Sequence, residues 1–202
     1  MTSLDEPAPA GPPLRLGAVV LAGGTAARMD GVEKASIELD GVTLLERVLA
    51  ATMSALEVVV VGAEVPTSRP VTFTREEPAG GGPAAALLAG LDRFLHAPDL
   101  VAVLAVDMPR VGAGTVARLT WAVEADPDVD GAVLVDARGR RQTLAAVYRR
   151  ASLLASAPPA PEDRHGLPVR RLVGALRLAE VPAVGQEAHD VDTWEDLRDL
   201  RH

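Results

Sequence analysis

The sequence predicts a single α/β domain, a three-layer α/β/α sandwich around a mostly parallel β-sheet, with one possible antiparallel strand at the sheet edge. Short apolar runs bounded by Gly, Pro or Asp alternate with segments of helical periodicity, a pattern typical of βαβ units. The chain has 202 residues, which fits one domain, and it is 48% hydrophobic but only 2% aromatic. A core of Val, Leu and Ala suits strands that are buried on both faces between helices.

The N-terminal half alternates predicted strands with one helix. The apolar run at 16–22 ends at Gly23-Gly24, as expected of a buried strand that enters a loop. Apolar residues at helical spacing in 43–55 predict an amphipathic helix. The short runs at 58–61 and 71–74 are rich in Val and Thr and predict two further strands.

The middle of the chain contains the most apolar predicted strand. Gly80-Gly81-Gly82 interrupts the chain, and Pro83 is tolerated in the first turn of a helix that we predict over 84–95. The run at 100–106 predicts a buried strand that ends at Asp107, and 115–125 predicts a helix. Asp107 is therefore expected at the carboxyl end of a strand, where open α/β sheets bind their ligands.

The C-terminal third is predicted to add two strands and two helices. Strands at 132–135 and 144–147 flank a polar segment at 136–140 that indicates a turn or hairpin loop. The remaining expected elements are a proline-rich loop at 157–163, a helix at 169–176 and a last helix that begins near Thr193.

The N-terminal segment and the composition exclude several classes of function. Residues 1–13 are polar and proline-rich, so we expect a disordered tail before one domain over 14–202. The segment lacks the features of a signal peptide, and no apolar stretch approaches the roughly 18 residues of a membrane span, so we expect a cytoplasmic protein with no membrane partner. A net charge of −8 without a visible basic cluster argues against a nucleic-acid partner. The absence of cysteine excludes disulfides, thiolate zinc sites and cysteine nucleophiles.

A Gly-rich loop follows the first predicted strand and extends from Gly23 to Lys34. Its glycines allow backbone N–H groups to approach a phosphate, and Arg28 and Lys34 can neutralise the phosphate charge. The loop contains neither a Walker motif nor Gly-x-Gly-x-x-Gly. By composition alone, a tight turn with two solvated basic side chains is an equally good interpretation.

Asp107 is the second candidate functional residue. Mg²⁺ prefers one or two carboxylates together with phosphate oxygens and water, and a carboxylate at the carboxyl edge of the sheet suits this role. A helix cap or turn residue is the structural alternative for an Asp after a strand.

Together these motifs resemble the signature of the MobA-like nucleotidyltransferases, the molybdenum cofactor guanylyltransferase family. Members carry Leu-Ala-Gly-Gly, then Arg-Met-Gly-Gly and Asp-Lys, and later an Asp-x-Pro motif. The matching positions are Leu21 to Gly24, Arg28-Met29, Gly31, Lys34 and Asp107-Met108-Pro109. The resemblance runs from about Gly17 to the C-terminus. It implies a Rossmann-like nucleotidyltransferase fold of the nucleotide-diphospho-sugar transferase type.

Two later segments extend the resemblance. Residues 80–87 are similar to the Gly-Pro-Leu-Ala-Gly segment of the family, and an acidic residue just upstream, Glu76 or Glu77, is implied to help bind the nucleoside. Residues 190–197 are similar to the ending Asn-x-Asn-Thr-Pro-Glu-Asp-Leu. Asp192 or Thr193 is expected to cap the last helix.

The resemblance implies a nucleotide site, a catalytic set and Mg²⁺ as cofactor. The implied nucleotide-binding residues are Leu21, Ala22, Gly23, Gly24, Lys34, Gly62, Glu76, Gly82, Pro83 and Asp107. The implied catalytic residues are Arg28, Lys34 and Asp107. The metal ligands are expected to be Asp107 and, by analogy with related nucleotidyltransferases, Asp190.

Four positions depart from the family pattern. Asp30 replaces a glycine and brings a negative charge near the expected phosphates, while Glu33 replaces an aspartate. Gly62 stands where members often have an asparagine on the nucleoside, which weakens the case for guanine. Trp194 replaces a proline at the start of the last helix.

The implied reaction is transfer of GMP from GTP to a phosphate-bearing, anionic pterin-type acceptor, molybdopterin or its molybdenum-loaded form, with release of pyrophosphate. One alternative is a nucleotidyltransferase of the same fold that uses CTP or another acceptor. A second is a catalytically impaired nucleotide-binding partner in cofactor assembly. A plain interaction domain would require the matched motifs to be coincidental. The sequence leaves the choice between monomer and homo-oligomer open.

Overall fold

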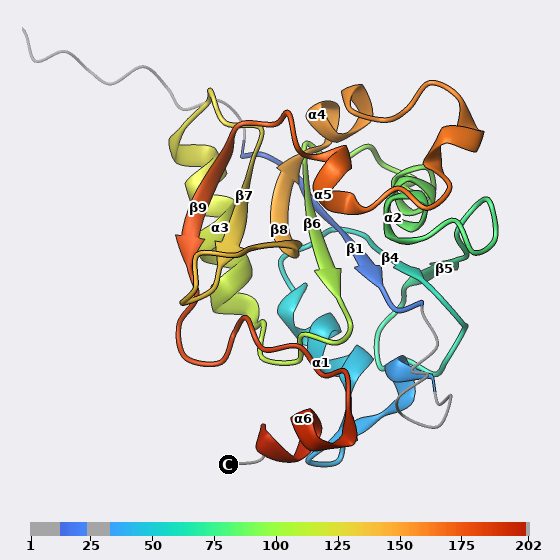
Figure 1. Cartoon of the computed structure of the whole chain (residues 1–202), viewed down its shortest axis with the longest axis vertical. Coiled ribbons are helices and arrows are strands. Elements are labelled where there is room, and N and C mark those ends of the chain that lie inside the picture. Colours follow the sequence, from blue (N-terminus) through green and yellow to red (C-terminus); the bar gives the residue numbers. More distant parts are fainter. Residues whose placement is uncertain (1–12, 24–32, 201–202) are drawn as a thin grey trace, which may run out of the picture.

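The computed structural model describes residues 13–23 and 33–200 and contains a seven-stranded sheet in the order β5-β4-β1-β6-β8-β7-β9 (Figure 1). The strands are β1 (Leu16–Leu21), β4 (Val58–Val61), β5 (Thr72–Thr74), β6 (Leu100–Ala105), β7 (Gly131–Val135), β8 (Arg141–Arg149) and β9 (Leu178–Pro182). A separate hairpin is formed by β2 (Glu38–Leu39) and β3 (Val42–Thr43).

Helices cover both faces of the sheet and give the predicted three layers. The α-helices are α1 (Leu44–Ala51), α2 (Pro83–Leu91), α3 (Ala113–Ala125), α4 (Arg150–Ala155), α5 (Val169–Leu172) and α6 (Trp194–Asp199). Short 3₁₀ turns are η1 (Lys34–Ser36) and η2 (Pro161–Arg164). One apolar cluster joins α1, α3 and α6 to one face of the sheet, and a second joins α2, α4 and α5 to the other.

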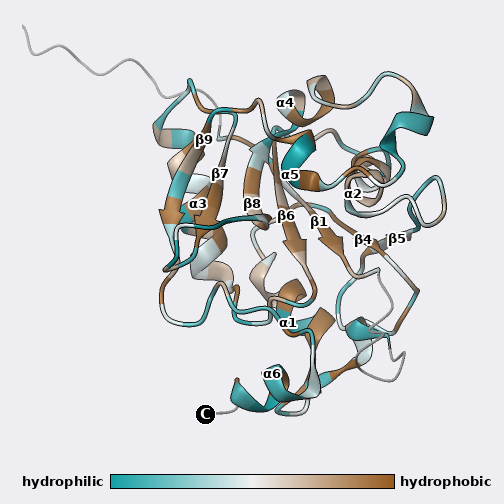
Figure 2. Cartoon of the chain, viewed as in Figure 1, coloured by the Kyte–Doolittle hydropathy of each residue, from teal (hydrophilic) through white to brown (hydrophobic). Residues whose placement is uncertain are grey.

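The central strands explain why the sheet forms. Every residue of β1, β4 and β6 is buried, and these strands are built of Val, Leu, Ala and one Gly (Figure 2). Strands without a polar face are stable only between two layers of helices.

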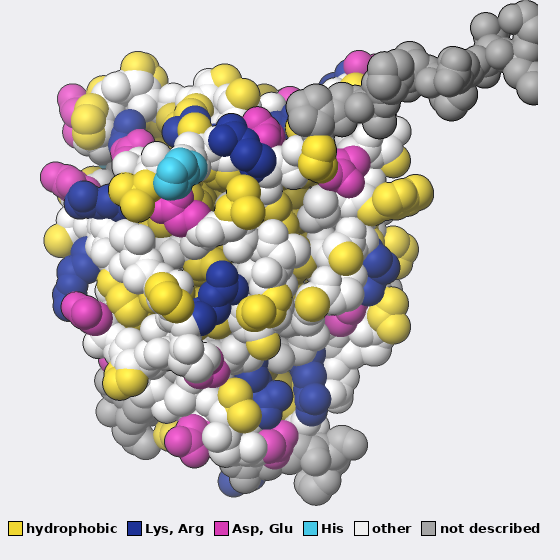
Figure 3. Space-filling view, turned by 180° about the vertical axis from the view of Figure 1, so that it is seen from behind, with side chains coloured by type: hydrophobic (Ala, Val, Ile, Leu, Met, Phe, Trp, Pro, Cys, Tyr) yellow, Lys and Arg dark blue, Asp and Glu magenta, His cyan; other side chains and the backbone are white. Residues whose placement is uncertain are grey.

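On the face seen in Figure 3, Lys and Arg side chains are scattered among Asp and Glu side chains. Within the described ranges, no helix combines the length and the apolar character needed to cross a bilayer.

The antiparallel strand was predicted at the sheet edge, and this prediction is wrong. It is β8, which lies inside the sheet and pairs antiparallel with both β6 and β7. The strands at the two edges, β5 and β9, are each parallel to their neighbour.

Several element boundaries also differ from the prediction. The first helix begins at Leu44 because the Thr43 side chain accepts a hydrogen bond from the Glu46 N–H, and it ends at Ala51 rather than at 55. The helix expected at 84–95 ends at Leu91, and the helix expected at 169–176 ends at Leu172. The helix α4, the strand β9 and the β2–β3 hairpin were not predicted. The tail predicted at 1–13 lies outside the described residues apart from Pro13.

An irregularity in β8 shapes the ligand edge of the sheet. Val133 of β7 pairs with Ala146, but the next residue, Leu134, pairs with Gln142, so residues 143–145 of β8 have no partner on β7. Bulges of this kind redirect side chains at the rim of a sheet. The buried hydroxyl of Tyr148 donates a hydrogen bond of 2.9 Å to the Thr143 carbonyl and thereby stabilises the bulge. Burial raises the pKa of Tyr148 far above its usual value.

The substitution Tyr148→Phe is expected to lower the free energy of unfolding by about 1–2 kcal/mol, because the Thr143 carbonyl loses its donor while the ring volume stays the same. Urea unfolding monitored by circular dichroism measures the change. An unchanged unfolding midpoint would show that water replaces the hydroxyl without cost.

Candidate functional site

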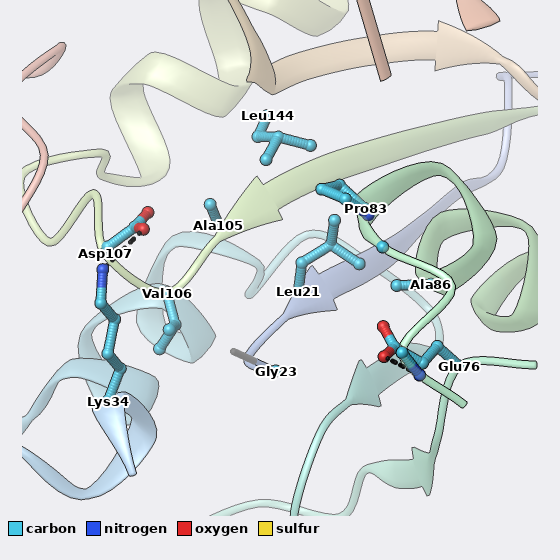
Figure 4. Close-up of a pocket in the computed structure, with 12 residues that line it drawn as sticks. Leu21, Gly23, Lys34, Glu76, Pro83, Ala86, Ala105, Val106, Asp107 and Leu144 are labelled. Atoms are coloured by element: carbon cyan, nitrogen blue, oxygen red, sulfur yellow. Dashed lines mark hydrogen bonds and ion pairs between the residues drawn. The ribbon is translucent and has the colours of Figure 1, made fainter. Parts of the chain in front are cut away.

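A cavity of about 360 Å³ opens at the carboxyl ends of β1 and β6 (Figure 4). Ligands bind at this edge in open α/β sheets because the loops after the parallel strands converge there. The cavity is lined by Leu21, Gly23, Lys34, Glu76, Gly80, Gly82, Pro83, Ala86, Ala105, Val106, Asp107 and Leu144. Leu144 belongs to the bulged part of β8, so the irregular strand forms one wall.

Most of the residues expected to bind a nucleotide line this cavity. They are Leu21, Gly23, Lys34, Glu76, Gly82, Pro83 and Asp107. Ala22 is fully buried, and its N–H donates to the Val61 carbonyl at 2.9 Å. Gly62 lines a neighbouring cavity of about 270 Å³ that shares Gly23, Glu76 and Gly80 with the first. The predicted residues Gly24 and Arg28, together with Asp30, lie outside the described part of the chain.

Lys34 and Asp107 are brought together from positions far apart in the sequence. Lys34 opens the 3₁₀ turn η1, which is anchored because Ala35 is buried in the core. Asp107 lies between the buried residues Val106 and Met108, so its own side chain faces the cavity. The Lys34 Nζ donates to Asp107 Oδ2 at 3.2 Å (Figure 4).

A second carboxylate meets the same ammonium group. The Lys34 Nζ donates to Asp192 Oδ1 at 2.7 Å. The Asp107 and Asp192 carboxylates therefore face the same position, which the Lys34 ammonium group occupies. Asp190 was the predicted second ligand. The structure places its charge near enough to affect Asp107, but it is Asp192 that contacts Lys34.

The segment that carries these two residues is fixed against Asp107. The Val191 N–H donates to the Asp107 carbonyl at 2.8 Å, and the Val191 side chain is fully buried. Thr193 is the N-cap of α6 and forms a capping box with Asp196. Of the two caps predicted for this helix, Asp192 and Thr193, the structure therefore has Thr193. Asp192 was predicted only as an alternative cap of the last helix. The sequence did contain a signal for Asp192, because Asp190 and Asp192 flank the apolar Val191 and so lie close together in the chain.

The pKa values of Lys34 and Asp107 are both raised, but for different reasons. Burial raises the pKa of Asp107, the Lys34 ammonium opposes the shift, and the charges of Asp192 and Asp190 add to it. Burial tends to lower the pKa of Lys34, but its hydrogen bonds and charge interactions with Asp192 and Asp107 raise it overall. Burial thus favours the neutral form of Asp107, whereas the two neighbouring carboxylates favour the charged form of Lys34.

The donor set fits a magnesium ion bound together with phosphate. Within the described residues, no three His, Cys, Asp or Glu side chains lie close enough to ligate one ion. Mg²⁺ needs only one or two carboxylates when phosphate oxygens and water complete its shell. Asp107 and Asp192 supply two carboxylates around a point that already holds a positive charge.

Of the two candidate glutamates, Glu76 lines the cavity, on the wall opposite Asp107. The Glu76 Oε1 accepts a hydrogen bond of 2.8 Å from the Gly80 N–H, and Glu76 lines both cavities at the site (Figure 4). Glu77 lines a different cavity. Gly82, with φ of 85°, is the N-cap of α2, and Pro83 occupies its first turn. Only glycine adopts this backbone conformation without strain.

Gly62 has a packing role that explains the absence of a side chain at this position. A Cβ atom there would lie 2.9 Å from the Ala22 carbonyl carbon and 3.0 Å from the Gly23 nitrogen. An asparagine at 62 would make the same contacts with the start of the Gly-rich loop.

The substitution Gly62→Ala is therefore expected to lower the free energy of unfolding by about 1–3 kcal/mol, because backbone atoms must move to accept the methyl group. Chemical denaturation measures the effect. Gly114→Ala is the matched control, since a Cβ atom there meets nothing within 4 Å, and it should be neutral or stabilising. Equal effects of the two substitutions would contradict the packing role of Gly62.

Comparisons with known proteins show which proteins the whole chain resembles. Residues 18–181 match the family model of the MobA-like NTP transferase domain. The molybdenum cofactor guanylyltransferase of Burkholderia cenocepacia (strain HI2424) is 33% identical over 208 residues, which cover 96% of this chain and 98% of the relative.

Two solved structures share the fold. The molybdopterin-guanine dinucleotide biosynthesis protein A of Archaeoglobus fulgidus superposes with a TM-score of 0.69 at 22% identity, covering 92% of this chain and 96% of that protein. The 2-C-methyl-D-erythritol 4-phosphate cytidylyltransferase of Thermus thermophilus gives a TM-score of 0.69 at 26% identity, covering 93% and 98%.

Proposed function

The chain belongs to the MobA-like NTP transferase family, and from this we propose that it transfers GMP from GTP to molybdopterin or its molybdenum-loaded form and releases pyrophosphate. The observation that carries the proposal is the convergence of Lys34, Asp107 and the start of the Gly-rich loop on one cavity. The guanylyltransferase name of the 33% identical relative supports the choice of donor and acceptor.

The chemistry requires positioning and charge stabilisation rather than a general base. A phosphate oxygen of the acceptor attacks the α-phosphorus of GTP, the bond from that phosphorus to the bridging oxygen breaks, and pyrophosphate leaves with the bond electrons. The acceptor phosphate is already deprotonated near neutral pH, so no side chain has to remove a proton. Negative charge on the transferred phosphate and on the leaving group must be stabilised.

The described residues divide these roles. Asp107 and Asp192 would hold magnesium, which when bound neutralises phosphate charge. Lys34 then directs its ammonium group to phosphate oxygens instead of to the two carboxylates. Leu21 and Pro83 offer apolar surface for the base or the ribose. Arg28 remains a predicted catalytic residue from its motif alone.

Glu76 supports guanine as the base. A carboxylate accepts hydrogen bonds, and guanine presents two adjacent N–H donors on its Watson–Crick edge, whereas cytosine presents an acceptor beside its donor. The hydrogen bond from the Gly80 N–H holds the Glu76 carboxylate at the cavity wall. CTP is the alternative donor, because the cytidylyltransferase of Thermus thermophilus shares the fold and Gly62 provides no side chain to select a base.

The proposal is tested by measuring pyrophosphate release with GTP, CTP, ATP or UTP, with and without magnesium, in the presence of molybdopterin. Magnesium-dependent release with GTP alone is the expected result. Release with CTP would assign the chain to the cytidylyl reaction. Tight binding of GTP without release in the presence of acceptor would identify a nucleotide-binding partner that does not turn over.

A further inference from the structure

The segment between β9 and α6 is held by a glutamate that the proposed chemistry does not use. Glu187 Oε1 accepts from the Thr115 hydroxyl at 2.6 Å, and Oε2 accepts from the Arg118 Nη2 at 2.6 Å. Oε2 also accepts from the Val184 N–H at 2.8 Å. These donors come from α3 and from the segment itself, so Glu187 ties the segment to a helix that packs against the sheet.

This contact is one of several that fix the segment. The Ala183 N–H donates to the Val135 carbonyl at its start, and the Val191 N–H donates to the Asp107 carbonyl near its end, next to the candidate metal site. Asp190 lies between the attachments at Glu187 and Val191, and Asp192 directly follows Val191. A rigid attachment at both ends restricts where the two carboxylates can lie, because few backbone torsions remain free between them.

The contacts of Glu187 are largely shielded from solvent, unlike those of a surface ion pair. Its side chain is 14% exposed, and Thr115 is fully buried. Burial opposes ionisation, but the hydrogen bonds from Arg118, Thr115 and Val184 lower the pKa of Glu187 overall. The charged form therefore makes the contact at neutral pH, and charge-assisted hydrogen bonds of this kind are about twice as strong as neutral ones.

We infer that Glu187 is a positioning residue that holds Asp192 beside Asp107 through the segment 183–192. The inference rests on the proposed function, because it assumes that these two carboxylates bind the metal that accompanies the triphosphate. Glu187 itself contacts neither the cavity nor Lys34 in the described structure, and it acts only through the segment.

The substitution Glu187→Ala is expected to weaken magnesium binding roughly tenfold, the scale usual for residues that orient metal ligands. The full-length protein is saturated with a non-hydrolysable GTP analogue and titrated with Mn²⁺ by electron paramagnetic resonance, so binding is read without turnover. Hydrogen–deuterium exchange of residues 184–192 is measured on the same samples, and it should increase there without increasing in the sheet.

Two further variants keep the test decisive. Glu180→Ala removes a glutamate of β9 whose ion pair with Arg141 is half exposed, and it should change neither metal affinity nor exchange in the segment. Arg118→Met removes only one partner of Glu187, so it serves if the alanine variant fails to fold, and it should shift both readouts in the same direction.

The outcomes separate this inference from the proposed function. Unchanged Mn²⁺ affinity and unchanged exchange in Glu187→Ala would overturn the inference, as would faster exchange throughout the chain, which indicates a general loss of stability. If the wild-type complex with the analogue binds no Mn²⁺, the proposed metal site fails, whereas local exchange in the segment still shows whether Glu187 holds it.

Discussion

Replacing Asp107 with asparagine is expected to lower kcat of nucleotidyl transfer by on the order of 10²–10³-fold and to remove most of its dependence on magnesium. Asparagine keeps the size of the side chain but has no charge with which to hold a divalent cation beside a triphosphate. Steady-state pyrophosphate release against magnesium concentration measures both effects.

The same substitution should not destabilise the free protein. The folded-state pKa of Asp107 is raised by burial and by Asp192 and Asp190, so ionising this carboxyl is harder in the folded chain than in the unfolded one. Its contribution to stability is thus fully present at low pH and is lost as the pH rises through the folded-state pKa. At pH 7 the asparagine variant should match or exceed the wild type in urea unfolding.

Companion variants test the choice of the second carboxylate. Asp192→Asn should share the loss of metal dependence, whereas Asp190→Asn should have a smaller effect because Asp190 does not contact Lys34 in the described structure. Normal magnesium-dependent turnover of Asp107→Asn would place the metal elsewhere. A larger effect of Asp190→Asn than of Asp192→Asn would instead support Asp190 as the second metal ligand, as expected from the sequence.

Replacing Lys34 with alanine is expected to reduce turnover by a similar factor, on the order of 10²–10³-fold, but to change stability in the opposite direction. The side chain is only 13% exposed and is the ammonium partner of both Asp107 and Asp192. Without it, the two carboxylates repel each other, and the free energy of unfolding should fall by about 1–2 kcal/mol, less than for a fully buried pair.

Magnesium should restore the stability of the Lys34→Ala variant, because a divalent cation can occupy the point that the ammonium group has left. Thermal unfolding with and without magnesium chloride measures the recovery, and sodium chloride at equal ionic strength is the control for screening. Wild-type turnover in this variant would remove Lys34 from the mechanism. Equal recovery with both salts would argue against a specific cation site.

The parts of the fold that the sequence predicts well are those that a continuous apolar run defines. The strands β1, β4 and β6 are apolar at every position or carry one glycine, and they were predicted almost to their ends. β8 was predicted only in its middle, at 144–147, and Arg141 and Gln142 make its N-terminal end polar. β9 alternates in burial at the sheet edge and was missed.

The β2–β3 hairpin was missed although its signal is present in the sequence. Asp40 and Gly41 have φ of 56° and 76°, the backbone conformation that an Asp-Gly pair favours in a two-residue turn. Each strand has only two residues, so no periodicity accompanied the turn.

For the site, local motifs and tertiary contacts contribute different residues. Lys34 and Asp107 each lie in a motif of consecutive residues, and the structure brings both to one cavity. Asp192 and Glu187 depend on how the segment after β9 lies against Asp107 and α3, which no spacing in the sequence specifies. The choice between Glu76 and Glu77 likewise depends on how the loop before α2 faces the cavity.

The two edges of the sheet have a consequence for how the protein behaves at high concentration. The outermost strands present little free backbone to another molecule: β5 has three residues, and β9 ends at Pro182 and carries the charged Glu180. Short strands, charges and proline at an edge hinder the addition of a foreign strand. The Val-rich strands that would aggregate most readily are enclosed between these edges, so the folded chain should resist self-association by strand addition even when it is concentrated.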